Sequence, residues 1–416
     1  MEESPTLPRR IGLTLITLYG IGGIVGAGIY ALIGELISAS GGLAPVAFLI
    51  AAVTAAFTGL SYAELSSYFP KNAGEAYYAK QAFNSGPTSL GIGLGVVCSS
   101  SAAAASLVVA FAGYATVLLP LPDQVLAIGF ILTLTLVALT GTVLSFRLIA
   151  IITLIEVGAL LFLIVVGVFK LPLLSSATLD LVFTMEDRTG PAVAFALSSG
   201  ALIAFFAFIG FEDIVNVAEE VKRPERNIPL AIILSLVIAT GLYVLVTLIA
   251  LWALPEELLA TSKSPLADVM KQLLGWGELP LVIIAMIAIT NGALIQIVLG
   301  SRLLAGLARM GLLPSPFAKT NPVNGTPITG VLLTASFILL LALSLPLGTL
   351  AKITSLVTLA VFTSVNLILL KLKKGATSLG LCPDGSAFRN PLVIPVLGFL
   401  SSFFLIAAEI FRLLFH

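Results

Sequence analysis

The stretch FFAFIGFED, residues 205–213, interrupts a long apolar run with one glycine and two carboxylates. Glycine is a poor helix former, and ionisable side chains inside a membrane segment are costly, so they are rare there and mark functional sites. The stretch therefore predicts that the helix is broken at Gly210, and that Glu212 and Asp213 lie next to the break.

A second stretch of this kind, GIGGIVGAG at residues 20–28, lies in the first apolar run. Each glycine in a regular helix costs about 1 kcal/mol relative to alanine, so this density predicts exposed backbone or very close packing. Gly22 and Gly26 form a GxxxG pair, which is typical of helix packing and would explain the stretch if it stood alone. A dinucleotide-binding loop is disfavoured because no strand precedes the glycines.

The composition is that of a membrane protein. Of the 416 residues, 58% are hydrophobic and 10% are charged, whereas soluble domains carry about 25% charged residues. A helix that crosses the bilayer needs about 20 apolar residues. We therefore expect an all-α membrane protein with a single domain, residues 1–416, and about eleven transmembrane helices, near residues 11–37, 43–68, 87–119, 124–143, 148–169, 191–217, 229–254, 278–308, 327–345, 348–370 and 391–413.

The two glycine-containing stretches lie in the first and the sixth of these segments. Because five is odd, the first five segments and the next five would enter the membrane from opposite sides, as in an inverted repeat. Interruptions at corresponding positions of two such halves point to the substrate site of a transporter. We therefore expect discontinuous helices 1 and 6, a first repeat at residues 1–170, a second at residues 191–370 and an additional helix at residues 391–413.

The basic residues predict the orientation. Most of the 21 Lys and Arg residues fall on one side if the N-terminus is cytoplasmic, as the positive-inside rule requires. We expect the chain in the plasma (inner) membrane, with its C-terminus outside. Residues 70–86 predict either a short interfacial helix or an ordinary polar connection. Glu64 is expected to be a charge near a helix end.

The backbone at two broken helices would suit a zwitterionic amino acid. Free N–H groups at the start of a half-helix attract a carboxylate, and free carbonyl groups at the end of a half-helix attract an ammonium group. The free N–H groups would be those of Gly26, Ala27 and Gly28, and the free carbonyl groups those near Ile24, Phe206 and Ile209, beside Gly210.

Glu156 lies deep in the fifth segment, about 12 Å from its cytoplasmic end at 1.5 Å per residue. An ionised acid there costs about 2.5–3.5 kcal/mol on insertion scales, so we expect it to be protonated or paired. Our hypothesis is that Glu156 exchanges a proton that is coupled to transport. A sodium site is the competing interpretation, and a neutral side chain bonded to a neighbouring helix is the structural alternative.

Three motifs resemble those of the amino acid–polyamine–organocation (APC) superfamily. The run GIVGAGIY, residues 23–30, is similar to its helix 1 signature. The stretch FAFIGFEDIVNVAEEVKRPERNIP, residues 206–229, resembles its helix 6 and the cytoplasmic loop that follows. The third match comprises GSR at residues 300–302, ARMGLLP at residues 308–314 and NGTP at residues 324–327.

The resemblance implies a LeuT-like 5+5 inverted repeat and a secondary active amino acid transporter that works by alternating access, through symport or exchange. It implies that Phe206 acts as an aromatic gate, and that Glu212 is a proton route or a contact for the substrate side chain. Glu156 stands where proton-coupled relatives often have a lysine. Two features depart from the family: Ala27 replaces a hydroxyl residue of some relatives, and many relatives have twelve helices.

The net charge and the His and Cys content disfavour several other classes of function. The formal net charge is zero, so the sequence predicts no nucleic-acid partner. One histidine, His416, and two distant cysteines offer no metal site and no catalytic residues, which disfavours an enzyme. We expect no cofactor besides a coupling ion, and the partners are a small substrate and the lipid bilayer. A polyamine or organic-cation carrier and a non-transporting sensor with the same fold stay open, and the oligomeric state is unknown.

Overall fold

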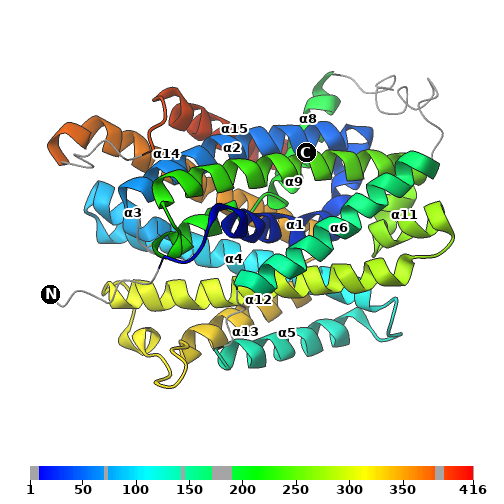
Figure 1. Ribbon diagram of the computed structural model, residues 1–416, viewed down its shortest axis with the longest axis horizontal. Coiled ribbons are helices and arrows are strands. Elements are labelled where there is room, and N and C mark those ends of the chain that lie inside the picture. The colour runs from blue at the N-terminus through cyan, green and yellow to red at the C-terminus, as the bar shows by residue number, and fades with distance from the viewer. Residues whose placement is uncertain (1–8, 70–73, 142–145, 171–189, 380–387, 416) are drawn as a thin grey trace.

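The computed structural model describes residues 9–69, 74–141, 146–170, 190–379 and 388–415. Within these ranges the chain folds into helices and short connections, and the only β-type pairing is an isolated bridge between Ile11 and Val221. The long helices run roughly along one direction, with α1 in the middle of the bundle (Figure 1). The all-α class predicted from the sequence is confirmed.

The α-helices and 3₁₀ helices (η) follow one another along the chain with short connections. In chain order they are α1 (Leu13–Ser40), η1 (Gly41–Leu43), α2 (Ala44–Tyr68), α3 (Gly74–Phe83), α4 (Gly86–Ala115), α5 (Asp123–Leu139), α6 (Phe146–Lys170), α8 (Gly190–Phe206), η2 (Phe211–Glu220), α9 (Pro224–Ala253), α10 (Glu256–Thr261), α11 (Pro265–Leu274), α12 (Glu278–Arg309), η3 (Ser315–Ala318), α13 (Ile328–Ser344), α14 (Leu347–Leu379) and α15 (Val393–Phe415).

Many of these helices are apolar enough to cross a bilayer. Among the described residues, eight stretches have the length and hydropathy of a membrane span, one of them running through both α1 and α2, and α5 and α13 are shorter apolar helices. Each predicted segment overlaps one of these helices. Large apolar side chains such as Leu136, Val237 and Leu340 are more than half exposed. So many exposed apolar groups suit contact with lipid rather than water.

The sixth predicted segment is interrupted, as its sequence indicates. α8 ends at Phe206, four residues in turn conformation follow, and the chain continues as the 3₁₀ helix η2. Gly210 has a φ of 121°, a conformation that residues with a Cβ rarely adopt. The break predicted at Gly210 is therefore confirmed.

The first predicted segment is not interrupted. α1 is helical from Leu13 to Ser40, so the prediction of a discontinuous helix 1 is wrong. Its glycines serve close packing instead, because a Cβ at Gly22 would overlap Thr153 of α6 and a Cβ at Gly28 would overlap Ala207. Glycine weakens a helix but removes no backbone hydrogen bond, so tight packing on several sides can keep α1 intact.

The start of α1 and the end of η2 are joined by backbone hydrogen bonds. The backbone N–H of Ile11 donates to the carbonyl of Glu220 at 3.0 Å, and the N–H of Lys222 donates to the carbonyl of Ile11 at 2.8 Å. These bonds satisfy backbone groups at the last residue of η2 and just outside the two helical segments. These contacts therefore join two stretches that lie about 200 residues apart in the sequence.

The connection after α2 is helical and packed. Residues 74–83 form α3, in agreement with the helical interpretation, and Glu75 and Tyr78 are buried. Glu64 is fully buried rather than a solvated helix-end charge, and its Oε1 lies 2.7 Å from Nζ of Lys373 on α14. A buried ion pair has to be complete, because one charge left alone is strongly destabilising.

Candidate functional site

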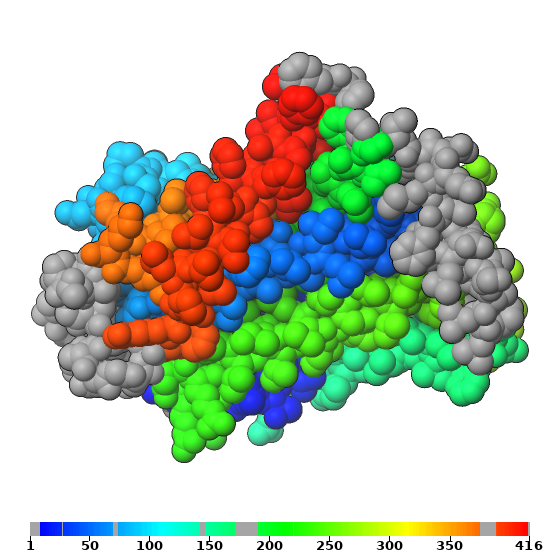
Figure 2. All heavy atoms as spheres, turned by 90° about the horizontal axis from the view of Figure 1, so that it is seen from above, coloured from blue at the N-terminus to red at the C-terminus, as the bar shows by residue number. Residues whose placement is uncertain are grey.

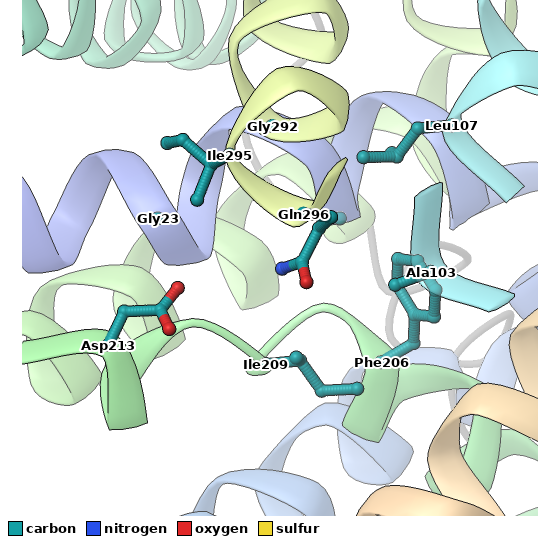
Figure 3. A pocket seen from close by; sticks show the side chains of 10 residues that line it. Gly23, Ala103, Leu107, Phe206, Ile209, Asp213, Gly292, Ile295 and Gln296 are labelled. Carbon is teal, nitrogen blue, oxygen red and sulfur yellow. The ribbon is translucent and has the colours of Figure 1, made fainter. Parts of the chain in front are cut away.

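A small cavity lies at the interruption between α8 and η2, close to the centre of α1 (Figure 3). Its volume is about 20 Å³, which is room for about one water molecule. Four segments contribute to the lining: α1, α4, the α8–η2 interruption with the start of η2, and α12. The lining residues are Gly23, Gly28, Ala103, Leu107, Phe206, Ile209, Asp213, Gly292, Ile295 and Gln296.

Gly210 and Gly23 hold the two glycine-containing stretches in contact. A Cβ at Gly210 would lie 2.6 Å from the carbonyl oxygen of Gly23, and a Cβ at Gly23 would lie 3.2 Å from the carbonyl oxygen of Gly210. Only two glycines allow backbones to approach this closely, and Gly210 also needs its positive φ. The sequence predicted that these stretches meet, and they do.

Tyr243 joins the interruption to α1. This α9 residue is fully buried, and its hydroxyl lies 2.7 Å from the carbonyl oxygen of Ile24 and 2.8 Å from that of Ala207. The phenol has one proton, so it donates to one carbonyl at a time. Sequence reasoning missed Tyr243, because a single tyrosine in an apolar helix is an ordinary core residue.

The two acids after the break have different surroundings. Oε2 of Glu212 accepts a hydrogen bond of 2.8 Å from the backbone N–H of Gly210, so this carboxylate caps the interrupted backbone. Asp213 instead lines the central cavity, and its carboxylate points into it (Figure 3). Of the two acids, Asp213 therefore lines the cavity, whereas Glu212 is bonded to the backbone at the break.

A larger cavity of about 380 Å³ continues from the central one. Asp213 and Ile295 line both cavities, so the two meet at these side chains. Tyr19, in the N-terminal half of α1, and Arg302, near the C-terminal end of α12, line the larger cavity as well. In the predicted orientation this cavity lies on the cytoplasmic side of the interruption.

Helix α12 supplies polar and small residues that sequence reasoning did not select. Gln296 points its carboxamide into the central cavity, toward the space that Asp213 also faces, and Gly292 lines the same wall (Figure 3). A lone glutamine within the apolar part of this helix was a usable signal, since polar groups in membrane segments pack against other helices or face a cavity.

Glu156 lies beside α1 and outside the lining of the central cavity. The residue is fully buried, and a Cβ at Gly26 would lie 3.1 Å from its Oε2 and 3.6 Å from the carbonyl oxygen of Ala288 on α12. Among the described residues, neither carboxylate oxygen has a hydrogen-bond partner. A buried acid without a partner is costly, and such an exception calls for a functional explanation.

The predicted substrate-binding residues gather around the break, but in two groups. Gly28, Phe206 and Ile209 line the central cavity, whereas Ile24 and Gly26 lie on α1 next to Tyr243 and Glu156. Gly26, Ala27 and Gly28 lie within a continuous helix, so they do not begin a half-helix with free N–H groups as predicted. The side chain of Ala27 is outside the described part of the structure.

The described residues contain no group of three His, Cys, Asp or Glu side chains that could hold a metal ion. The polar groups at the site are instead the Asp213 carboxylate, the Gln296 carboxamide and backbone carbonyls. Such groups can bind a small cationic or zwitterionic solute through hydrogen bonds and charge, without covalent chemistry.

Comparison with known proteins identifies the family. The amino acid permease family matches residues 11–413. Chloroplastic cationic amino acid transporter 9 of Arabidopsis thaliana is 30% identical over 76% of this chain. The matched part covers 58% of that relative's length. The branched-chain amino acid permease and the methylthioribose transporter of Bacillus subtilis (strain 168) are 29% and 28% identical, each over 96% of this chain and 88% of the relative. The chain therefore belongs to the amino acid permease family of the APC superfamily, whose members are multi-pass membrane transporters and not enzymes.

Proposed function

We propose that the chain is a secondary active transporter that carries amino acids across the plasma membrane by alternating access. The observation that carries this proposal is the interrupted α8–η2 segment, whose Gly210 lies against Gly23 of α1 beside a cavity lined by Asp213 and Gln296. Broken helices at the centre of a transporter provide backbone groups to a substrate. The fold would be LeuT-like, with repeats at residues 1–170 and 191–370.

The ammonium group of the substrate would bind at the broken segment. Phe206 is the last residue of α8 and Ile209 lies in the turn that follows, and both residues line the cavity. Carbonyl oxygens at a helix C-terminus carry partial negative charge, and the Asp213 carboxylate adds to it. An amino acid bound here would lie within reach of Gln296 as well.

The carboxylate would need N–H groups from α1, and Tyr243 offers a way to release one. In an α-helix the N–H of Gly28 bonds to the carbonyl of Ile24. The Tyr243 hydroxyl lies 2.7 Å from this carbonyl and can donate to it. The N–H of Gly28 can therefore turn to a substrate without leaving the Ile24 carbonyl unsatisfied, and the neighbouring glycines lower the cost of this local opening.

The cavities support an inward-facing route. The central cavity is too small for an amino acid, whereas the cavity of about 380 Å³ that continues from it can hold one. Asp213 and Ile295 form the boundary between the two. Movement of η2 relative to α12 would widen this boundary and release the substrate to the cytoplasm.

Glu156 would couple transport to a proton. Its carboxylate and the Ala288 carbonyl of α12 both lie close to Gly26 of α1, and the carboxylate has no hydrogen-bond partner among the described residues. When protonated, it can donate to a backbone carbonyl, and when ionised, it would attract a cation. Because α1 contacts it directly, a change in its protonation would change the packing of α1.

Uptake into liposomes tests the function and its coupling. Purified protein should accumulate at least one of the twenty amino acids, and a panel with polyamines, simple amines and methylthioribose tests the competing substrates. Absence of flux for every solute would favour a sensor. Glu156→Gln should abolish accumulation driven by a proton gradient. Loss of sodium-driven uptake instead would identify sodium, and unchanged coupling would exclude both ions at Glu156.

A further inference from the structure

Five exposed basic residues lie where the chain enters α1 and α9. Arg9 and Arg10 precede α1, Lys222 and Arg223 lie between η2 and α9, and Arg226 is in the first turn of α9. In the predicted orientation these residues, the basic patch, are at the cytoplasmic surface of the membrane. We propose that the basic patch binds the phosphate headgroup of an anionic lipid in the cytoplasmic leaflet.

The two segments of the basic patch are joined through their backbones. The N–H of Arg10 donates to the carbonyl of Glu220 at 2.9 Å, and the N–H of Lys222 donates to the carbonyl of Ile11 at 2.8 Å. Helices α1 and α9 pack against each other, and on the surface the start of α1, in dark blue, lies beside α9, in green (Figure 2). Basic residues that are far apart in the sequence therefore form one surface.

The positive charge of the basic patch is not neutralised within the described part of the chain. None of its five side chains forms an ion pair with a described residue. Of the acids nearby, Glu220 lines the larger cavity and Glu225 is partly buried in the first turn of α9, while the side chain of Glu219 is outside the described part. The basic residues outnumber even these three acids, so the surface is complementary to an anion.

The backbone holds three of these cations in an electrostatically unfavourable place. Lys222, Arg223 and Arg226 lie at the N-terminal end of the 30-residue helix α9, where the helix carries partial positive charge and cations are unfavourable unless an anion offsets them. Arg223 has a φ of 47°, and its carbonyl accepts the N–H groups of Arg226 at 3.0 Å and of Asn227 at 2.9 Å. The first hydrogen bonds of α9 therefore fix this turn.

The partner is a lipid because the basic patch directly precedes two apolar helices. α1 begins at Leu13, and α9 has the length and hydropathy of a membrane span from Pro224 to Ala253. Clusters of about 4–8 Lys and Arg residues next to a span attract anionic lipids of the cytoplasmic leaflet. The positive-inside rule also places basic residues on this side, but it requires no cluster. A headgroup held here would stabilise the contact between the start of α1 and the end of η2.

Thermal unfolding in a neutral detergent with added lipid tests the proposal. Phosphatidylglycerol should raise the unfolding midpoint of wild type by about 3 °C, because a ligand that binds only the folded state stabilises it. Phosphatidylcholine should leave the midpoint unchanged. The triple variant Arg10→Gln/Arg223→Gln/Arg226→Gln should lose at least half of the rise. An equal rise with inorganic phosphate would overturn the assignment to a lipid.

A second triple variant controls for the loss of charge as such. Arg309→Gln/Lys319→Gln/Lys374→Gln removes the same charge from exposed residues that are predicted to lie on the same side of the membrane. This variant should keep the full rise with phosphatidylglycerol. An equal loss in the two triple variants would show that only the overall charge matters, and would overturn the basic patch as a site.

Photocrosslinking of wild type in nanodiscs keeps the test independent of variant folding. A photoactivatable phosphatidylglycerol should label peptides that contain residues 9–10 or 222–226, and excess phosphatidylglycerol, but not phosphatidylcholine, should reduce this labelling at least threefold. Labelling spread over the chain without preference for these residues would overturn the proposal. Neither measurement needs substrate flux, so both are independent of the proposed transport function.

Discussion

At the scale of the single residue, Gly210 is the position that tolerates least change. Gly210→Ala would require a φ of 121° in a residue with a Cβ and would place that Cβ 2.6 Å from the Gly23 carbonyl oxygen. Strain of this kind costs about 1–3 kcal/mol. We expect a lower thermal unfolding midpoint in detergent and at least a tenfold loss of uptake.

A matched glycine provides the control. Gly241 lies inside α9 with nothing within 4 Å of its Cβ position. Alanine there should be neutral or stabilise the helix by up to about 1 kcal/mol. Equal effects of Gly210→Ala and Gly241→Ala on stability and uptake would contradict the importance of the contact with Gly23.

Glu75 of α3 should make stability depend on pH. Burial raises the pKa of Glu75 above its ordinary value of 4.5, so the folded protein holds this proton more tightly than the unfolded chain. The stabilisation is complete below that ordinary value and is lost as the pH rises through the raised pKa. Glu75→Gln should therefore be more stable than wild type at about pH 8, with a smaller difference at about pH 5.

Thermal unfolding of both proteins across this pH range checks the expectation. The Tyr62 hydroxyl, 2.8 Å from Oε1 of Glu75, can still donate to the carbonyl oxygen of a glutamine. The substitution therefore keeps this hydrogen bond and removes only the titratable proton. An advantage of Glu75→Gln that does not change with pH would show that the carboxyl proton has no part in it.

At the scale of the helices, Tyr243 connects three elements through one hydroxyl. It lies on α9 and reaches the carbonyl of Ile24 in α1 and that of Ala207 just after α8. Tyr243→Phe keeps the ring contacts with Phe48 and Phe208 but leaves buried carbonyls short of a donor. We expect a loss of about 1–3 kcal/mol and reduced uptake.

The comparison for Tyr243→Phe is Thr240→Ala, on the same helix. The Thr240 hydroxyl bonds only within its own helix, to the carbonyl of Leu236 at 2.6 Å, so its loss should change the unfolding midpoint little. If Tyr243→Phe lowers stability without changing uptake, the hydroxyl is a packing element and not part of the opening proposed for α1.

At the scale of the whole molecule, the helices predict the side of each terminus. An N-terminus inside and eleven crossings require the C-terminus outside. Alkaline phosphatase is active only outside the cytoplasm, so we expect activity when it is fused after residue 416 and none when it is fused after Asn390, which precedes α15. The reverse pattern would mean that the number of crossings or the orientation is wrong.

Much of the architecture was readable from local sequence. Long apolar runs predicted the helices because a span must satisfy its own backbone and face lipid. The break at Gly210 was predictable because glycine and two carboxylates together oppose a regular apolar helix. The same reasoning failed for α1. Its glycines lower helix stability, but they allow close packing against Thr153, Ala207 and Gly210, and α1 stays helical.

The sequence by itself determined a membrane protein of apolar helices with a break before Glu212, since composition and helix chemistry act locally. Only the tertiary structure decided that α1 stays helical, that Asp213 and not Glu212 faces the cavity, and that Gln296 joins it. These outcomes depend on which side chains meet across helices, and such contacts between distant parts of the chain leave no periodic pattern in the sequence.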